Sequence, residues 1–187
     1  MMPRTNFFFV AILFACLLSS SCSNQAEPGN ANTPKIQVTS GAFAEGRPIP
    51  DKYTGQGEDL SPPLQWSGAP AGAQSFALIC EDPDAPMGTF THWIVYNMPP
   101  ATAALSENVP KTETLPNGTR QGKNDFGNIG YNGPAPPPGK THHYYFRLYA
   151  LDTVLNLDSG TTKNDVVSAM KGHVLAQGDA MGTYLKQ

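Results

Sequence analysis

Short runs in which apolar and polar residues alternate, separated by proline-rich segments, recur along most of the chain. The run 142–151 is the strongest of them. Successive side chains of a strand point to opposite faces, and here both sets are largely apolar or aromatic: one face has His142, Tyr144, Phe146, Leu148 and Ala150, and the other has His143, Tyr145, Arg147, Tyr149 and Leu151. We therefore expect a central strand that is covered on both sides.

Other segments also have the composition or alternation of strands. We expect a first strand at 36–40, an extended segment with two prolines at 60–66, and strands at 76–80 and 92–98. The segment 99–120 is low in apolar residues and indicates a loop, with one short strand near Leu105. Most of the chain is therefore predicted to be β-structure and loop.

One segment has helical spacing instead. Apolar residues recur from Asp165 to about Gln177, Asn164 is placed to cap the helix, and Asp165 suits its first turn. Strands separated by proline-rich loops, followed by one late helix, predict a mainly β fold, an antiparallel β-sandwich with a C-terminal helix.

The first residues have the pattern of an export signal. Arg4 precedes an apolar run at 7–18, which is too short to span a bilayer and has the length of a signal-peptide core. Small residues then lead to Cys22, as in bacterial lipoprotein signals, where that cysteine receives lipid. We expect a signal peptide at 1–21, a lipid on Cys22, and a periplasmic or outer-membrane-associated lipoprotein of a bacterium.

Two alternatives to this processing remain open. An ordinary secretory signal would be cut near Ser21 or Ala26, and Cys16 is a poorer lipidation site because the apolar core before it would be about halved. The segment 22–34 is rich in Asn, Ala, Pro and Gly without periodicity, which is typical of a flexible tether. Cys80 ends an apolar strand and is expected to be a buried free thiol.

The remaining residues, 35–187, have the size of one domain. Removal of Arg4 with the signal reduces Lys and Arg from 12 to 11 against 15 Asp and Glu, a net charge of −4. No basic stripe occurs, which argues against a nucleic-acid partner.

Two separated clusters carry candidate chemistry. The first is Asp-Pro-Asp-Ala-Pro at 82–86, followed by His92 at the start of a predicted strand. Its prolines stiffen the turn, although Asp-Pro is also common in ordinary turns. The second is the loop 124–141, rich in Gly and Pro, which leads into His142; its backbone N–H groups could bind an anion.

These motifs, taken together, resemble the phosphatidylethanolamine-binding protein family. The resemblance rests on the 82–86 box, Thr-His-Trp at 91–93, Gly-Tyr-Asn-Gly-Pro at 130–134 and His-His-Tyr at 142–144, and it extends over about 36–187. It is closest to the bacterial branch described as Raf-kinase-inhibitor-like. Where the family commonly has Arg between the histidine and the tyrosine, this chain has His143, which alternation places on the opposite face from His142.

The resemblance implies a β-sandwich with a small anion pocket, a phosphorylated or otherwise anionic ligand, and no cofactor. The pocket positions of the family fall on Asp82, Asp84, His92, His142 and Tyr144, with Gly133 and Pro134 at the rim. We expect nearby carboxylates to keep the two histidines protonated, so that they can donate to the anion.

Three functions are compatible with these residues. The first is a non-catalytic, membrane-tethered protein that binds a small anionic group. The second is an inhibitor of a protease or kinase-like partner. The third is a metal-dependent hydrolase that uses Asp82, Asp84, His92 and His142, because Asp and His are adequate zinc or manganese ligands. We favour the first, since the chain has no Gly-x-Ser-x-Gly or His-Glu-x-x-His motif.

Overall fold

Two antiparallel sheets form the protein, seen in a computed structural model that describes residues 33–158 and 160–187. The predicted signal peptide and Cys22 lie outside the described residues. The small sheet has the order β1 (Gln37–Ser40), β2 (Leu64–Ser67), β5 (Ala104–Leu105). The large sheet has the order β6 (Arg120–Gln121), β4 (Phe90–Met98), β3 (Ser75–Asp82), β7 (His142–Leu151), β8 (Val174–Tyr184). The mainly β, antiparallel prediction is confirmed.

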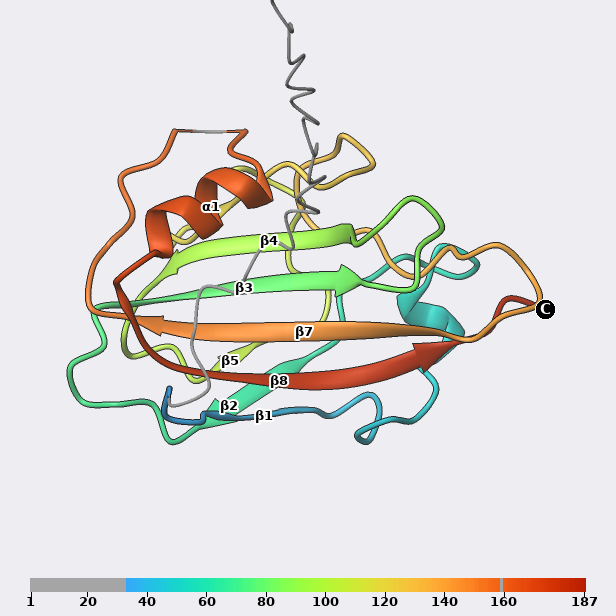
Figure 1. The fold of residues 1–187 in the computed structure, drawn as a ribbon, viewed down its shortest axis with the longest axis horizontal. Helices are drawn as coiled ribbons and strands as arrows, with labels where there is room; N and C mark the ends of the chain where they lie inside the picture. The colour runs from blue at the N-terminus through green and yellow to red at the C-terminus, as the bar shows by residue number, and fades with distance from the viewer. Residues whose placement is uncertain (1–32, 159) are drawn as a thin grey trace, which may run out of the picture.

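The two faces of β7 are covered by different layers, as its alternation predicted. Its Tyr144, Phe146 and Leu148 belong to the core between the sheets, whereas Tyr149 and Leu151 pack in a second core with the helix α1 (Lys163–Met170). Figure 1 shows the long strands β4, β3, β7 and β8 side by side, with β7 inside the sheet. Cys80 is a free cysteine with an exposed fraction of 0%, also as predicted.

The predicted helix is correct only in its first half. α1 ends at Met170, Gly172 adopts a φ of 82°, and β8 begins at Val174. A glycine with positive φ is a common helix terminator, and Val174 continued the helical spacing only by coincidence. The N-cap is Thr162 rather than Asn164, and the Asp165 carboxylate accepts hydrogen bonds from the N–H and the hydroxyl of Thr162. The helix is therefore followed by an edge strand of 11 residues.

The outer edge of β8 is covered by segments from the N-terminal part of the domain. Ile36 N donates to Gln177 O at 2.8 Å, and Ile49 N donates to Thr183 O at 2.7 Å. Glycines of β8 permit this approach, because a Cβ on Gly178 would lie 1.8 Å from the carbonyl oxygen of Ile36. The edge is thereby paired, which removes a site for aggregation.

The other short elements are a 3-10 helix at Asp51–Tyr53, β5, which was predicted near Leu105, and β6, which was not predicted. No helix within the described ranges is long and apolar enough to cross a membrane.

Replacement of Gly178 by Ala tests the covered edge. We expect Gly178→Ala to lower the free energy of unfolding by about 1–3 kcal/mol, because the methyl group overlaps a backbone carbonyl that cannot move without breaking the pairing. Urea denaturation measures this. Gly72→Ala is the matched control, since its Cβ would meet only Leu175 Cδ1, at 3.7 Å. Equal stability of the two variants would contradict the close packing of β8.

Candidate functional site

A cavity of about 570 Å³ opens at the end of the large sheet where β3 ends and β7 begins. Three segments line it: the turn between β3 and β4, the loop between β6 and β7, and the start of β7. The lining residues are Asp82, Ala85, Pro86, Met87, Gly88, Thr89, Phe90, His92, Asp125, Phe126, Ala135, Pro136, Pro137, His142 and Tyr144. The two clusters of the sequence therefore meet, although 60 residues separate Asp82 from His142.

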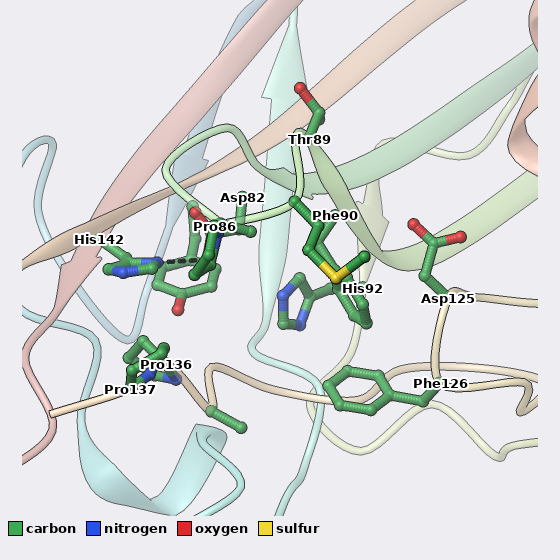
Figure 2. A pocket seen from close by; sticks show the side chains of 15 residues that line it. Asp82, Pro86, Thr89, Phe90, His92, Asp125, Phe126, Pro136, Pro137 and His142 are labelled. Carbon is green, nitrogen blue, oxygen red and sulfur yellow. Dashed lines mark hydrogen bonds and ion pairs between the residues drawn. The ribbon is translucent and has the colours of Figure 1, made fainter.

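Asp82 and His142 form a buried pair on one wall. Asp82 Oδ2 accepts from His142 Nδ1 at 2.7 Å, and each side chain is only 4% exposed. Asp82 Oδ1 accepts a second hydrogen bond from the N–H of Asp84 at 2.8 Å. Figure 2 shows this pair on the opposite side of the cavity from Asp125 and Phe126. Because Asp82 is held by two donors, His142 has a fixed ring orientation.

His92 reaches the same cavity because of an irregularity in β4. Cys80 pairs with Trp93 and Glu81 pairs with Thr91, so His92 is the additional residue of a β-bulge. In strict alternation His92 would share the face of Ile94, which packs in the core beneath α1. Bulges reorient side chains in this way, and the bulge turns His92 toward the cavity.

One ring nitrogen of His92 is hydrogen-bonded to the loop between β6 and β7. His92 Nδ1 lies 2.8 Å from the carbonyl oxygen of Asn132, and Asn132 N donates to His92 O at 3.1 Å. A carbonyl oxygen only accepts, so Nδ1 carries the hydrogen. The ring also makes edge-on contacts with Tyr144, Phe90 and Phe126, at centroid distances of 5.2, 5.3 and 5.4 Å.

The expected protonation of His92 is wrong. Burial lowers the pKa of His92 below its ordinary value, and this effect outweighs the opposing contributions of the Asn132 carbonyl and of Asp82. His92 is therefore neutral at neutral pH. Its surroundings are largely aromatic rather than acidic, and the sequence did not reveal this because Phe126 comes from a distant loop.

Tyr144 contributes a buried hydroxyl. Its side chain has an exposed fraction of 0%, and Oη has no hydrogen-bond partner among the described residues. Burial raises the pKa of Tyr144 well above its ordinary value, and so does the Asp82 carboxylate, which lies close to Oη but outside hydrogen-bond geometry. The hydroxyl therefore stays protonated. An unpaired buried hydroxyl is costly, and a ligand in the cavity could satisfy it.

The loop beneath His92 is held by Asp59. Its carboxylate accepts from Gly133 N at 2.6 Å, from Asn132 Nδ2 at 2.9 Å and from Lys111 Nζ at 2.7 Å. Gly133 is needed here, because a Cβ would lie 2.2 Å from the carbonyl oxygen of Tyr53. Asp59 and Asn132 were not predicted as site residues. Asp59 belongs to no motif, and Asn132, although it lies in the 130–134 motif, acts through its backbone carbonyl, which binds His92.

Three of the predicted site residues do not line the cavity. Asp84 faces away and binds His143, whose Nδ1 lies 2.7 Å and whose backbone N lies 3.0 Å from Oδ2. Lys140 Nζ lies 3.1 Å from the other oxygen. Gly133 and Pro134 form the loop behind the wall. The structure thus brings together Asp82, His92, His142 and Tyr144, and it places His143 outside, as alternation predicted.

The rest of the cavity lining is mostly apolar, and the sequence analysis did not single it out. Phe126 lies on the side opposite Asp82, whereas Pro86 lies next to Asp82, and Pro136 and Pro137 lie next to His142, in Figure 2. Met87, Phe90 and Ala135 complete the apolar part of the lining. Met87 is fully exposed and Phe126 is 44% exposed. Asp125 also lines this side, with Oδ2 accepting from Thr91 N at 2.7 Å. These apolar residues lie in the same two loops as the sequence motifs, and this position could have indicated that they line the cavity.

The metal-site hypothesis has no support in this geometry. Within 33–158 and 160–187, no group of three or more His, Cys, Asp or Glu side chains is arranged to hold a metal ion. The proposed set is divided because Asp84 points away from the cavity and His92 Nδ1 is bound to a carbonyl.

Comparison with known proteins identifies the family. A family model described as "Phosphatidylethanolamine-binding protein" matches residues 39–185. The chain belongs to the phosphatidylethanolamine-binding protein family. A UPF0098 protein of Methanothermobacter thermautotrophicus is 54% identical over 143 residues, which cover 76% of this chain and 94% of that protein.

Two solved structures of this family have the same fold. A putative phosphatidylethanolamine-binding protein homologue, CT736 of Chlamydia trachomatis, is similar with a TM-score of 0.75 and 45% identity, covering 83% of this chain and 100% of that one. E. coli YbcL, described as a member of the mammalian family, gives a TM-score of 0.76 at 34% identity, covering 82% of this chain and 99% of that one.

The Asp84 contacts predict a pH dependence of stability for this family member. The hydrogen bond from His143 is the main reason that the pKa of Asp84 falls from 3.8 to about 2, with Lys140 contributing. A carboxyl group with a lower pKa in the folded state stabilises fully above its unfolded pKa, and that stabilisation is lost as pH falls from about 4 to about 2.

We therefore expect Asp84→Asn to be less stable than wild type by about 1 kcal/mol at neutral pH and nearly equal to it at about pH 2. Urea denaturation between these pH values measures the difference. Glu58→Gln, an exposed loop substitution, should follow the wild-type profile. A constant difference across the range would show that the Asp84 carboxylate contributes no such linkage.

Proposed function

We propose that this protein is non-catalytic and binds a small anionic or phosphorylated group in the cavity between Asp82, His92, His142 and Tyr144. The buried, unpaired hydroxyl of Tyr144 is the observation that carries the proposal. A hydroxyl that stays protonated can donate a hydrogen bond, and oxyanion oxygens are strong acceptors. His142, oriented by Asp82, supplies a second polar group from the same strand.

The apolar lining of the cavity strengthens hydrogen bonds to a bound anion, because it limits the access of water. Prolines and aromatic rings surround the polar end, so a hydrogen bond made there is little screened by solvent. The single cysteine of the described residues, Cys80, does not line the cavity and gives no support for nucleophilic chemistry. Cys80 is fully buried and burial raises its pKa, which leaves it a poor nucleophile.

Replacement of Tyr144 by Phe tests this function. We expect Tyr144→Phe to weaken binding of inorganic phosphate about 10–100-fold, because one hydrogen bond to a charged oxygen is lost. The unfolding free energy should stay equal or rise slightly, since an unsatisfied hydroxyl is removed. NMR titration of the full-length protein measures the affinity.

Tyr145→Phe is the matched control, because Tyr145 lies on the opposite face of β7. It should bind phosphate as wild type does. If phosphate causes no shifts at His92, His142 or Tyr144 in the wild-type protein, the proposed anion site is wrong. Equal phosphate affinities of wild type and Tyr144→Phe would show that the Tyr144 hydroxyl does not bind the anion.

We also propose that the protein is exported and anchored by a lipid on Cys22, on the basis of the residue pattern at 1–22. Cys22→Ser should abolish incorporation of labelled fatty acid in a bacterial host, whereas Cys16→Ser should not. Mass spectrometry of the mature N-terminus checks the product. An unmodified N-terminus following Ser21 or Ala26 would instead indicate ordinary secretory processing.

A further inference from the structure

The hydrogen bonds of His92 determine what it can offer a ligand. Its Nδ1–H is donated to the Asn132 carbonyl, and the neutral ring then has a lone pair on Nε2. Figure 2 shows the ring of His92 with its other nitrogen directed toward the side where Asp82 and His142 lie. In the ligand-free protein His92 is therefore an acceptor at the cavity, not a donor.

The loop prevents His92 from changing this role by rotation. Asn132 is held by its own N–H to His92 O, and its side chain is held by Asp59 and Asn124. A flipped ring would place a carbon against the Asn132 carbonyl and lose the 2.8 Å bond. Nε2 can become a donor only by gaining a proton.

The other ionisable groups around His92 come from three elements. Asp82 lies at the end of β3, His142 and Tyr144 lie on β7, and Asp125 lies on the loop after β6. Asp82 and Asp125 would both stabilise a proton on His92, whereas burial opposes it. Tyr144 remains a neutral donor. The polar end thus combines a donor hydroxyl with an acceptor nitrogen.

From this geometry we propose that the cavity selects oxyanions that carry their own proton, such as hydrogen phosphate, over oxyanions that carry none. The proposal rests on the anion-binding function above. The P–OH group donates its hydrogen to His92 Nε2, while an unprotonated oxygen accepts from Tyr144 Oη. The proton either stays on the ligand oxygen or moves to Nε2, and no other reactant is needed.

Sulfate is the natural comparison, because it has the shape of phosphate but no proton at neutral pH. It would leave Nε2 without a hydrogen bond unless the protein takes a proton from solvent. Sites that pair a ligand hydrogen with a buried acceptor discriminate strongly against analogues without that hydrogen. We expect phosphate to bind at least about tenfold more tightly than sulfate near pH 8.

Isothermal titration calorimetry of the full-length protein tests this with sodium phosphate and sodium sulfate. Titrations in two buffers with different heats of ionisation give the number of protons taken up. Sulfate should bind with about one proton taken up, so its affinity should fall about tenfold per pH unit. Phosphate, as the monohydrogen dianion above about pH 7.5, should take up about none.

His92→Gln provides a variant test, because glutamine can donate or accept but does not titrate. In His92→Gln the affinities for phosphate and sulfate should become nearly equal, and the pH dependence of sulfate binding should disappear. The matched control is His173→Gln, whose histidine is exposed and paired with Asp152 at the other end of β7. It should behave as wild type.

The outcomes separate the two proposals. Equal affinities for phosphate and sulfate with parallel pH dependence would overturn the selection inferred here and leave the anion site intact. Absence of binding by either ion would overturn the anion site itself. The proton count comes from the wild-type protein, so the inference can fail even if His92→Gln does not fold.

Discussion

The end of β3 places two neighbouring carboxylates in the protein interior, and each must be neutralised on its own face of the sheet. Glu81 and Asp82 are 2% and 3% exposed. Glu81 pairs with Arg147 and Lys163 beneath α1, whereas Asp82 is held by His142 and the backbone of Asp84. An unpaired buried charge costs ~3–5 kcal/mol. The same two residues thus tie the helix, β7 and the turn to one strand end.

This arrangement explains why the cavity can be both polar and stable. Asp82 faces the cavity between the turn after β3 and the loop before β7. The bulge at His92 and the loop anchored by Asp59 then close that space from two sides. Asp82 and His142 hold each other, and His92 is held by the Asn132 carbonyl, so the positions of these three side chains do not depend on a ligand.

The sequence analysis predicted best those features that depend on residues close together in the chain. Alternation predicted both faces of β7 because strand periodicity is local. The ordered motifs identified Asp82, His92, His142 and Tyr144, which do line the cavity. The end of α1 was misjudged because Val174 suits helix and strand alike, and pairing with β7 decides between them. Gly172 was the overlooked local signal.

At the site, the residues Asp84, Gly133 and Pro134 were misplaced, and the error for His92 concerns its environment rather than its position. The protonation of His92 depends on burial by Phe90 and Phe126, and no motif encodes that desolvation. The two histidines, alike in sequence, consequently differ in chemistry: one Nδ1–H is donated to a carboxylate and the other to a carbonyl. The two histidines thus present different partners to the cavity, and the proposed selection among oxyanions depends on this difference.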